Sequence, residues 1–272
     1  MANIVQKFGG SSVASAEHIK HVANRISNRA SRGDKIVVVV SAMGDTTDDL
    51  NRLALSMAQN PNPREMDVLL STGEMITSTL LSMGLNDLGV NAISLSGAQA
   101  GIITDDVFGR ARISEIKTDR INSELEKGRV VIVAGFQGIS SDFDVTTFGR
   151  GGSDTTAVAL AAALEASRCE IYTDVAGVYT ADPRICSSAR PLREIGYEEM
   201  LEMASTGARV MHARAVEIGE LYDVPILVTS SFDEDANGTL IHREITMEQG
   251  NKVRGVAHQD KVAKVTVRGV PD

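Results

Sequence analysis

Short apolar runs alternate along the chain with segments in which hydrophobic residues recur every three or four positions. Runs rich in β-branched residues, such as KIVVVV at residues 35–40, are typical of strands buried on both faces of a parallel sheet. Helical spacing, as in Ile19, Val22 and Ile26, predicts an amphipathic helix, with Ser15 as its N-cap. This alternation predicts an α/β fold with helices on both faces of a mostly parallel sheet, in one three-layer domain.

The same pattern extends along the chain. Strands are predicted at residues 2–8, 35–40, 91–96, 129–135, 169–174 and 226–230, and further helices at 65–88, 113–126, 154–166, 197–203 and 209–222. Residues 1–250 are expected to form this domain. Near the C-terminus, residues 252–257 and 262–267 have a strand pattern around a polar turn, so residues 251–272 are expected to be a linker and the first strand of another module.

Composition and charge narrow the class of protein. The 272 residues carry a formal net charge of -9, which argues against a general nucleic-acid surface. We find no apolar leader and expect no segment that spans a membrane. The two cysteines, Cys169 and Cys186, form no CxxC motif, and no HExxH motif occurs, so neither a disulfide nor a structural zinc is expected. The chain is expected to be a soluble cytoplasmic protein.

Clusters of glycine and polar residues follow the predicted strands, where an open parallel sheet binds its ligands. They are KFGGSS (7–12), SAMGDTT (41–47), SG (96–97), GFQG (135–138), TD (173–174) and GRGGSDTT (149–156). Two of them place Gly-Gly-Ser before a helix, where free N–H groups and the helix dipole favour an anion. Neither matches a P-loop or a Rossmann motif, and either could be a packing turn. The nearby cations Lys7 and Arg150 favour a phosphate site.

A further stretch, YTDVAGVYTADPR at residues 172–184, has two interpretations. It could form a nucleotide pocket, with aromatic and short apolar residues around a base and Arg184 near the phosphates. It could equally be a hairpin followed by an Asp-Pro turn. The residues alone leave both open.

Several motifs occur together and in order: KFGGSSV, SAMGDTT, STGE, AGFQG, GRGGSDTTA, YTDVAGVYTADPR and YEEMLEMASTGARVMHARAVE. Together they resemble the aspartate kinases, a branch of the amino acid kinase family. The resemblance implies a three-layer αβα sandwich around an eight-stranded, mainly parallel sheet. It implies transfer of the ATP γ-phosphoryl group to the side-chain carboxylate of L-aspartate, giving 4-phospho-L-aspartate for lysine, threonine and methionine synthesis. It also implies a homodimer, and Mg²⁺ held mainly by the ATP phosphates rather than by dedicated protein ligands.

The resemblance assigns roles to individual residues. Lys7 and Asp154 are the expected catalytic residues. The phosphoryl group is expected at Lys7, Gly9, Gly10 and Ser11, aspartate at Ser41, Thr47, Glu74, Arg150, Gly152 and Ser153, and the nucleotide at Thr173, Asp174, Tyr179, Asp182, Arg184 and Arg209. Many relatives carry lysine where this chain has Arg209, which keeps the charge and changes the geometry.

The expected chemistry agrees with these residue types. A carboxylate with a pKa of about 3.9 is already ionised at neutral pH, so no general base is needed. Catalysis then depends on positioning and charge neutralisation by Lys7, backbone N–H groups and Mg²⁺. Lys7 has no acidic neighbour in sequence, and we expect phosphate to be its partner. Arg150 suits the α-carboxylate of the substrate, and Glu74 suits its ammonium group.

Two other functions stay open. The first is a kinase of the same fold that acts on glutamate or N-acetylglutamate, and the second is a catalytically silent sensor of an amino acid or nucleotide. The five histidines form no ligand pattern. In aspartate kinases the segment after the kinase domain leads into ACT modules, which bind the feedback amino acid. The chain is therefore expected to be a catalytic domain without its regulator, which is either missing or carried by a separate subunit.

Overall fold

The computed structural model describes residues 3–207, 210–243 and 255–258, and its main sheet has eight strands. The strand order is β10-β12-β11-β9-β1-β2-β6-β3. The strands are β1 (Asn3–Phe8), β2 (Lys35–Val40), β3 (Ala92–Leu95), β6 (Val130–Ala134), β9 (Arg168–Thr173), β10 (Glu194–Gly196), β11 (Ile226–Ser230) and β12 (Thr239–His242). Every neighbouring pair is parallel except β11 with β12, which confirms the predicted mainly parallel sheet.

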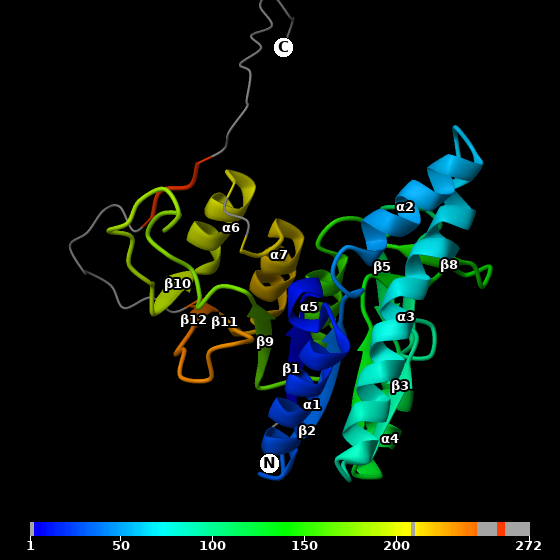
Figure 1. Ribbon diagram of the computed structural model, residues 1–272, viewed down its shortest axis with the longest axis horizontal. Coiled ribbons are helices and arrows are strands. Elements are labelled where there is room, and N and C mark those ends of the chain that lie inside the picture. Colours follow the sequence, from blue (N-terminus) through cyan, green and yellow to red (C-terminus); the bar gives the residue numbers. More distant parts are fainter. Residues whose placement is uncertain (1–2, 208–209, 244–254, 259–272) are drawn as a thin grey trace, which may run out of the picture.

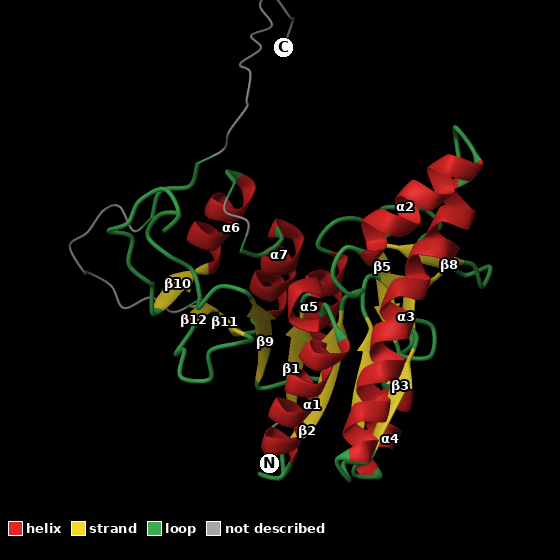
Figure 2. Ribbon diagram, viewed as in Figure 1, coloured by secondary structure: helices red, strands yellow, loops and turns green. Residues whose placement is uncertain are grey.

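Helices cover both faces of this sheet, so the predicted three layers are present (Figure 1 and Figure 2). The helices are α1 (Ala16–Ala30), α2 (Thr46–Met57), α3 (Pro63–Asp87), α4 (Asp119–Glu126), α5 (Gly152–Ala163), α6 (Tyr197–Ser205) and α7 (Ala213–Tyr222), with a 3-10 turn, η1 (Gly10–Val13), before α1. One buried cluster joins α1 and α3 to the sheet, and a second joins α4, α5, α6 and α7 to its other face. In Figure 1, α1 and α3 lie side by side, and α2 packs on α3.

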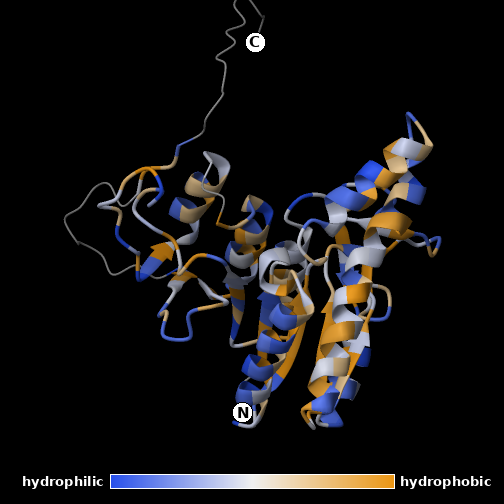
Figure 3. Cartoon of the chain, viewed as in Figure 1, coloured by the Kyte–Doolittle hydropathy of each residue, from blue (hydrophilic) through white to orange (hydrophobic). Residues whose placement is uncertain are grey.

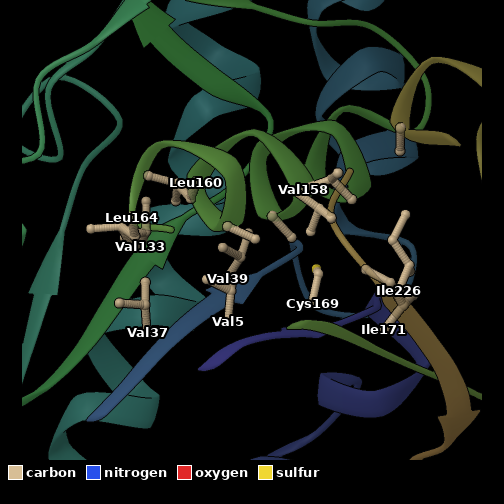
Figure 4. Close-up of a cluster of buried hydrophobic side chains, with 14 of the residues drawn as sticks. Val5, Val37, Val39, Val133, Val158, Leu160, Leu164, Cys169, Ile171 and Ile226 are labelled. Atoms are coloured by element: carbon tan, nitrogen blue, oxygen red, sulfur yellow. The ribbon is translucent and has the colours of Figure 1, made fainter. Parts of the chain in front are cut away.

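The valine-rich strands form the core because their alternate residues enter different layers. Val5, Val37 and Val39 pack under α5, whereas Phe8 and Val38 belong to the cluster under α1 and α3. Figure 4 shows the valines of β1 and β2 directed toward α5, and Figure 3 shows the hydrophobic strands behind the more polar α1. Each such side chain contributes about 1.5–3 kcal/mol through burial.

A smaller second sheet corrects one prediction. It has the order β5-β4-β7-β8, with β4 (Ile102–Thr104), β5 (Ile113–Ile116), β7 (Gln137–Ile139) and β8 (Val145–Thr147). The helix predicted at residues 113–126 was wrong over its first part, because residues 113–116 form β5 and α4 begins only at Asp119. A register shift beside Ser114 lets Ile113 and Ile116 pack on the same core. Their spacing of three therefore imitates a helix.

By length and composition alone, the long helix α3 could cross a membrane, although we expected no such segment in the chain. Half of its apolar segment is buried, and the helix packs against α1, β3, β6 and β8. Its packing is that of a core helix.

The structure bears on three other expectations. The predicted N-cap Ser15 of α1 is confirmed, since its hydroxyl accepts a hydrogen bond from the His18 N–H at 3.3 Å. The first Gly-Gly-Ser, predicted to lie before a helix, opens the short turn η1 that precedes α1. The strand predicted at 252–257 was wrong over residues 255–257, which have no strand structure. The remainder of that strand and the one at 262–267 lie outside the described residues.

Candidate active site

Lys7 and Asp154 meet at the edge where the parallel strands of the main sheet end. Lys7 lies next to the last residue of β1 and shares a face with Val5, so its side chain points toward α5. Asp154 lies in the first turn of α5, and its Oδ1 is 2.6 Å from Lys7 Nζ. Both side chains are only 12% exposed, so a fixed positive and a fixed negative charge lie at a helix N-terminus.

The turn after β1 lies against the turn after β2. A Cβ at Gly10 would lie 3.1 Å from the Ala42 carbonyl oxygen, so this close approach favours glycine. The Gly44 N–H donates to the Gly10 carbonyl at 3.1 Å, and the Ser41 N–H donates to the Phe8 carbonyl at 3.1 Å. The two turns therefore form one surface beside Lys7.

Glu74 extends this surface from the middle of α3. Its Oε1 accepts a hydrogen bond from the Ala42 N–H at 3.1 Å, and the residue is 3% exposed. Its Oε2 is buried and has no partner within the described part of the chain. Burial raises the pKa of Glu74 to about 7, although hydrogen bonds from backbone N–H groups oppose the shift. The site thus holds a carboxylate oxygen that a cationic ligand would satisfy.

The loop 149–153 leads into α5. Gly151 is the N-cap of α5 with φ 72°, and Gly152 and Ser153 form the start of the helix, as the anion-site prediction requires. A Cβ at Gly151 would lie 2.3 Å from the His212 ring, so this histidine packs directly on the loop. Arg150 is exposed and forms no ion pair within the described ranges.

The segment after β9 borders the first turn from the other side. The Gly9 N–H donates to the Tyr172 carbonyl at 3.3 Å, and the Thr173 hydroxyl donates to Asp174 at 3.0 Å. Beyond them Tyr179 pairs antiparallel with Pro191, flanked by hydrogen bonds from the Thr180 N–H to the Arg190 carbonyl at 2.9 Å and from the Leu192 N–H to the Val178 carbonyl at 2.8 Å. The segment thus pairs with residues beyond 184, and both interpretations of it stay open.

Asp182 and Arg184 neutralise each other at the far end of this segment. Arg184 Nη2 lies 2.7 Å from Asp182 Oδ2, and hydrogen bonds from the Arg184 side chain and backbone lower the pKa of Asp182 to about 2. The Arg184 side chain is 82% exposed, so its charge faces solvent.

The structure thus brings together one group of the expected residues. These residues are Lys7, Gly9, Gly10, Ser41, Glu74, Gly152, Ser153 and Asp154, with Thr173 beside them. Thr47 lies in the first turn of α2, Ser11 is an exposed residue of η1, and Arg209 lies outside the described residues. Within the described ranges, no group of three His, Cys, Asp or Glu side chains could hold a metal ion.

Two residues that hold the loop before α5 in place were not predicted from the sequence. Buried Asp67 of α3 accepts hydrogen bonds from the Gly109 N–H, the Thr147 N–H and the Thr147 hydroxyl, at 2.7–3.0 Å. It thereby anchors β8 just before the loop 149–153. His212, the N-cap of α7, packs on Gly151. Neither residue follows a strand, so neither belongs to the polar clusters at the strand ends.

Comparisons with known proteins all indicate the same family. The pattern of the amino acid kinase family matches residues 3–230. The aspartokinase of Geobacillus stearothermophilus is 55% identical over 270 residues, which cover 99% of this chain and 66% of that protein. Aspartokinase 2 of Bacillus subtilis is 54% identical over 270 residues, with the same coverage. The chain therefore spans slightly less than two thirds of the length of these curated relatives.

Solved structures agree. Aspartate kinase from Synechocystis is similar with a TM-score of 0.80 and 52% identity, over 89% of this chain and 40% of that one. E. coli aspartokinase III in complex with aspartate and ADP has a TM-score of 0.83 and 30% identity, over 94% of this chain and 67% of that one. A UMP kinase from Bacillus anthracis, with a TM-score of 0.67 and 19% identity, shares the fold alone.

Proposed function

The chain belongs to the amino acid kinase family, and from this premise we propose that it transfers the γ-phosphoryl group of ATP to the side-chain carboxylate of L-aspartate, forming 4-phospho-L-aspartate. The observation that carries the proposal is the buried, half-satisfied carboxylate of Glu74 at the same strand-end edge as Lys7. An amino-acid ammonium group would satisfy Glu74 Oε2. The similarity to aspartokinases supports the same substrate.

Lys7 is the main electrostatic group of the proposed reaction. The acceptor carboxylate and the γ-phosphate are both anionic, so the barrier to their approach is charge repulsion. Asp154 holds the Lys7 ammonium at 2.6 Å and so orients it before substrates bind. Backbone N–H groups of Gly10 and Ser11 would add donors to the phosphoryl oxygens, and Gly9 lets them approach closely.

The substrate backbone would be held at two points. Glu74 accepts the ammonium group, and the exposed guanidinium of Arg150 pairs with the α-carboxylate in a bidentate manner. The start of α5 at Gly152 and Ser153 follows Arg150 closely in sequence and favours negative charge. Ser41 and Thr47 supply hydroxyls from the end of β2 and the start of α2.

The nucleotide would lie along the segment after β9. We assign it to Thr173, Asp174, Tyr179, Asp182 and Arg184, with Arg209 as an additional cation. Because the Asp154 carboxylate is already paired with Lys7, the residues present suit a Mg²⁺ ion that the ATP phosphates hold rather than a protein cage. Bound there, Mg²⁺ would neutralise phosphate charge.

The remaining assignments concern the domain bounds, the location of the protein and its assembly. We assign residues 1–250 to the kinase domain and residues 251–272 to a segment leading toward a regulatory ACT module. We assign the chain to the cytoplasm as a homodimer. The exposed Ile76, Leu80 and Met83 follow one another at helical spacing on α3 and give a second copy an apolar face to cover.

A hydroxylamine trap tests the proposal, because hydroxylamine converts an acyl phosphate to a stable hydroxamate. The full chain is incubated with MgATP and, separately, L-aspartate, L-glutamate or N-acetyl-L-glutamate. We expect hydroxamate with L-aspartate only. Product with N-acetyl-L-glutamate, which lacks the ammonium group, would overturn the role of Glu74, and no product with any acceptor would favour the silent sensor.

A further inference from the structure

A cationic recess lies on the α1 face of the sheet, opposite the face that α5 and Asp154 cover. Its volume is about 220 Å³, and it is lined by Gln6, Arg25, Asn28, Arg29, Arg32, Tyr172 and Glu234. Arg25, Arg29 and Arg32 are spaced by four and three positions, so they follow one stripe along α1 and the turn after it. Gln6 and Lys7 are neighbours on β1, and their side chains therefore point to opposite faces of the sheet.

Arg25 is held in place before any ligand arrives. Its guanidinium lies over the Tyr172 ring at 4.6 Å from the centroid, and its Nη1 donates to the Ser231 carbonyl at 3.2 Å. The Tyr172 ring is itself stacked on Phe8, at 4.6 Å between centroids. Neither contact of Arg25 neutralises its charge, because one partner is an aromatic ring and the other a neutral carbonyl.

The other two arginines differ in whether a carboxylate neutralises their charge. Arg29 pairs with Asp34 at 2.8 Å and lies 3.7 Å from Glu170, so its charge is matched inside the protein. Arg32 is exposed, and neither it nor Arg25 forms an ion pair within residues 3–207, 210–243 and 255–258. The recess thus presents two guanidinium groups whose charge no carboxylate of the described chain pairs.

Gln6 provides an independent sign of a missing partner. It is 1% exposed, and its Nε2 donates to Glu170 Oε2 at 2.8 Å. Glu170 is held ionised: burial raises its pKa, but hydrogen bonds from Gln6, Arg168 and Tyr172 and the charge of Arg168 lower it overall. This fixes the amide, and leaves Gln6 Oε1 buried with no donor in the described part of the structure. An unsatisfied buried carbonyl is costly, so a ligand hydroxyl would be favoured there.

We propose that this recess binds a small phosphate monoester that carries hydroxyl groups. A phosphate monoester has about 1.5–2 negative charges at neutral pH, which matches the two unpaired guanidinium groups of Arg25 and Arg32. A monocarboxylate would match one of them. Gln6 Oε1 and the exposed Glu234 accept hydrogen bonds and so take the hydroxyls. Asn28, between the arginines on α1, supplies a further donor.

The test is titration calorimetry with sn-glycerol 3-phosphate at low salt, where screening is weak. The full chain carries Lys7→Ala throughout, which removes the phosphate site proposed at the other edge. We expect one binding event. Adding Arg32→Gln should weaken it about tenfold or more, as for loss of a charge-assisted hydrogen bond, and Arg25→Gln with Arg32→Gln should abolish it. Arg32 is exposed, so its substitution leaves the fold intact.

The matched control is Arg52→Gln, which removes an equally charged, exposed arginine of α2 far from the recess and should leave the affinity unchanged. Glycerol should not bind, and L-lactate, a hydroxylated monocarboxylate, should bind more weakly than the phosphate ester. Equal affinity of the Arg32→Gln and control chains would overturn the proposal. So would tighter binding of L-lactate, or no binding up to roughly 10 mM ester, well beyond a millimolar dissociation constant. These outcomes are independent of the hydroxylamine trap.

Discussion

Lys7 Nζ and Asp154 Oδ1 lie 2.6 Å apart, although one residue lies near the end of β1 and the other in the first turn of α5. Each charge is mostly removed from water and is compensated by the other. The pair therefore links β1 to α5 and holds an ammonium group in the direction of the proposed phosphoryl site. An arrangement that exists before the substrates bind needs no reorganisation during the reaction.

Replacing Lys7 should lower catalysis, and it should also lower stability, because it leaves the Asp154 carboxylate without its partner. We expect Lys7→Ala to lower kcat by roughly 10²–10³-fold, as for the loss of one preorganised electrostatic group. Lys20→Ala, at an exposed position of α1, is the control and should retain full activity. Steady-state kinetics and circular dichroism on both variants check this. A folded Lys7→Ala chain with near-normal kcat would remove Lys7 from the proposed mechanism.

The pair of Lys7 and Asp154 could be predicted from the sequence only in part. Lys7 was predicted to meet phosphate because it has no acidic neighbour in sequence, yet the fold supplies Asp154 as its partner in the described structure. The main strands and the Gly-Gly-Ser start of α5 follow from local patterns. The bulge beside Ser114 and the packing of His212 on Gly151 depend on pairing between distant segments, which no local pattern records.

Glu74 should make stability depend on pH. Burial raises its pKa from 4.5 to about 7 in the folded chain, so between these values the folded state holds a proton that the unfolded state releases. Stability should therefore fall as pH rises through this window, by up to about 3 kcal/mol, and stay lower above it. Glu74→Gln cannot ionise and should raise Tm at pH 8 but not at pH 4.

Thermal unfolding of the wild type and Glu74→Gln across this pH range measures the effect. Glu65→Gln is the matched control, since Glu65 lies in the first turn of the same helix and is 64% exposed. Parallel pH profiles for all three chains would show that Glu74 titrates normally.

Aspartate binding should also depend on the ionisation of Glu74, and it should improve with rising pH where stability falls. An ammonium group pairs with the ionised carboxylate, so KM for aspartate should fall as pH rises through about 7. In Glu74→Gln, KM for aspartate should rise and lose this pH dependence, while KM for ATP changes little. Initial rates at several pH values separate the two substrates. Equal rises in both KM values would place Glu74 outside the amino-acid site.

Gly151 should be irreplaceable for two separable reasons. Its φ of 72° disfavours any residue with a Cβ, at a cost of about 1 kcal/mol, and the new atom would also lie 2.3 Å from His212. Gly33 is the matched control, because it has φ 87° but a Cβ added there would meet no other atom within 4 Å. Gly33→Ala should therefore show only the backbone effect, as a small loss in urea stability with full activity.

Gly151→Ala must in addition move His212 or the loop 149–153, and so displace the start of α5 that carries Asp154. We expect a larger loss of stability than in Gly33→Ala and a fall in kcat. Adding His212→Ala to Gly151→Ala removes the obstructing ring and should recover part of the lost activity. Urea unfolding and steady-state kinetics measure stability and kcat for the wild type, Gly33→Ala, Gly151→Ala and the double variant. If Gly151→Ala and Gly33→Ala behave alike, the contact with His212 does not position the active-site loop.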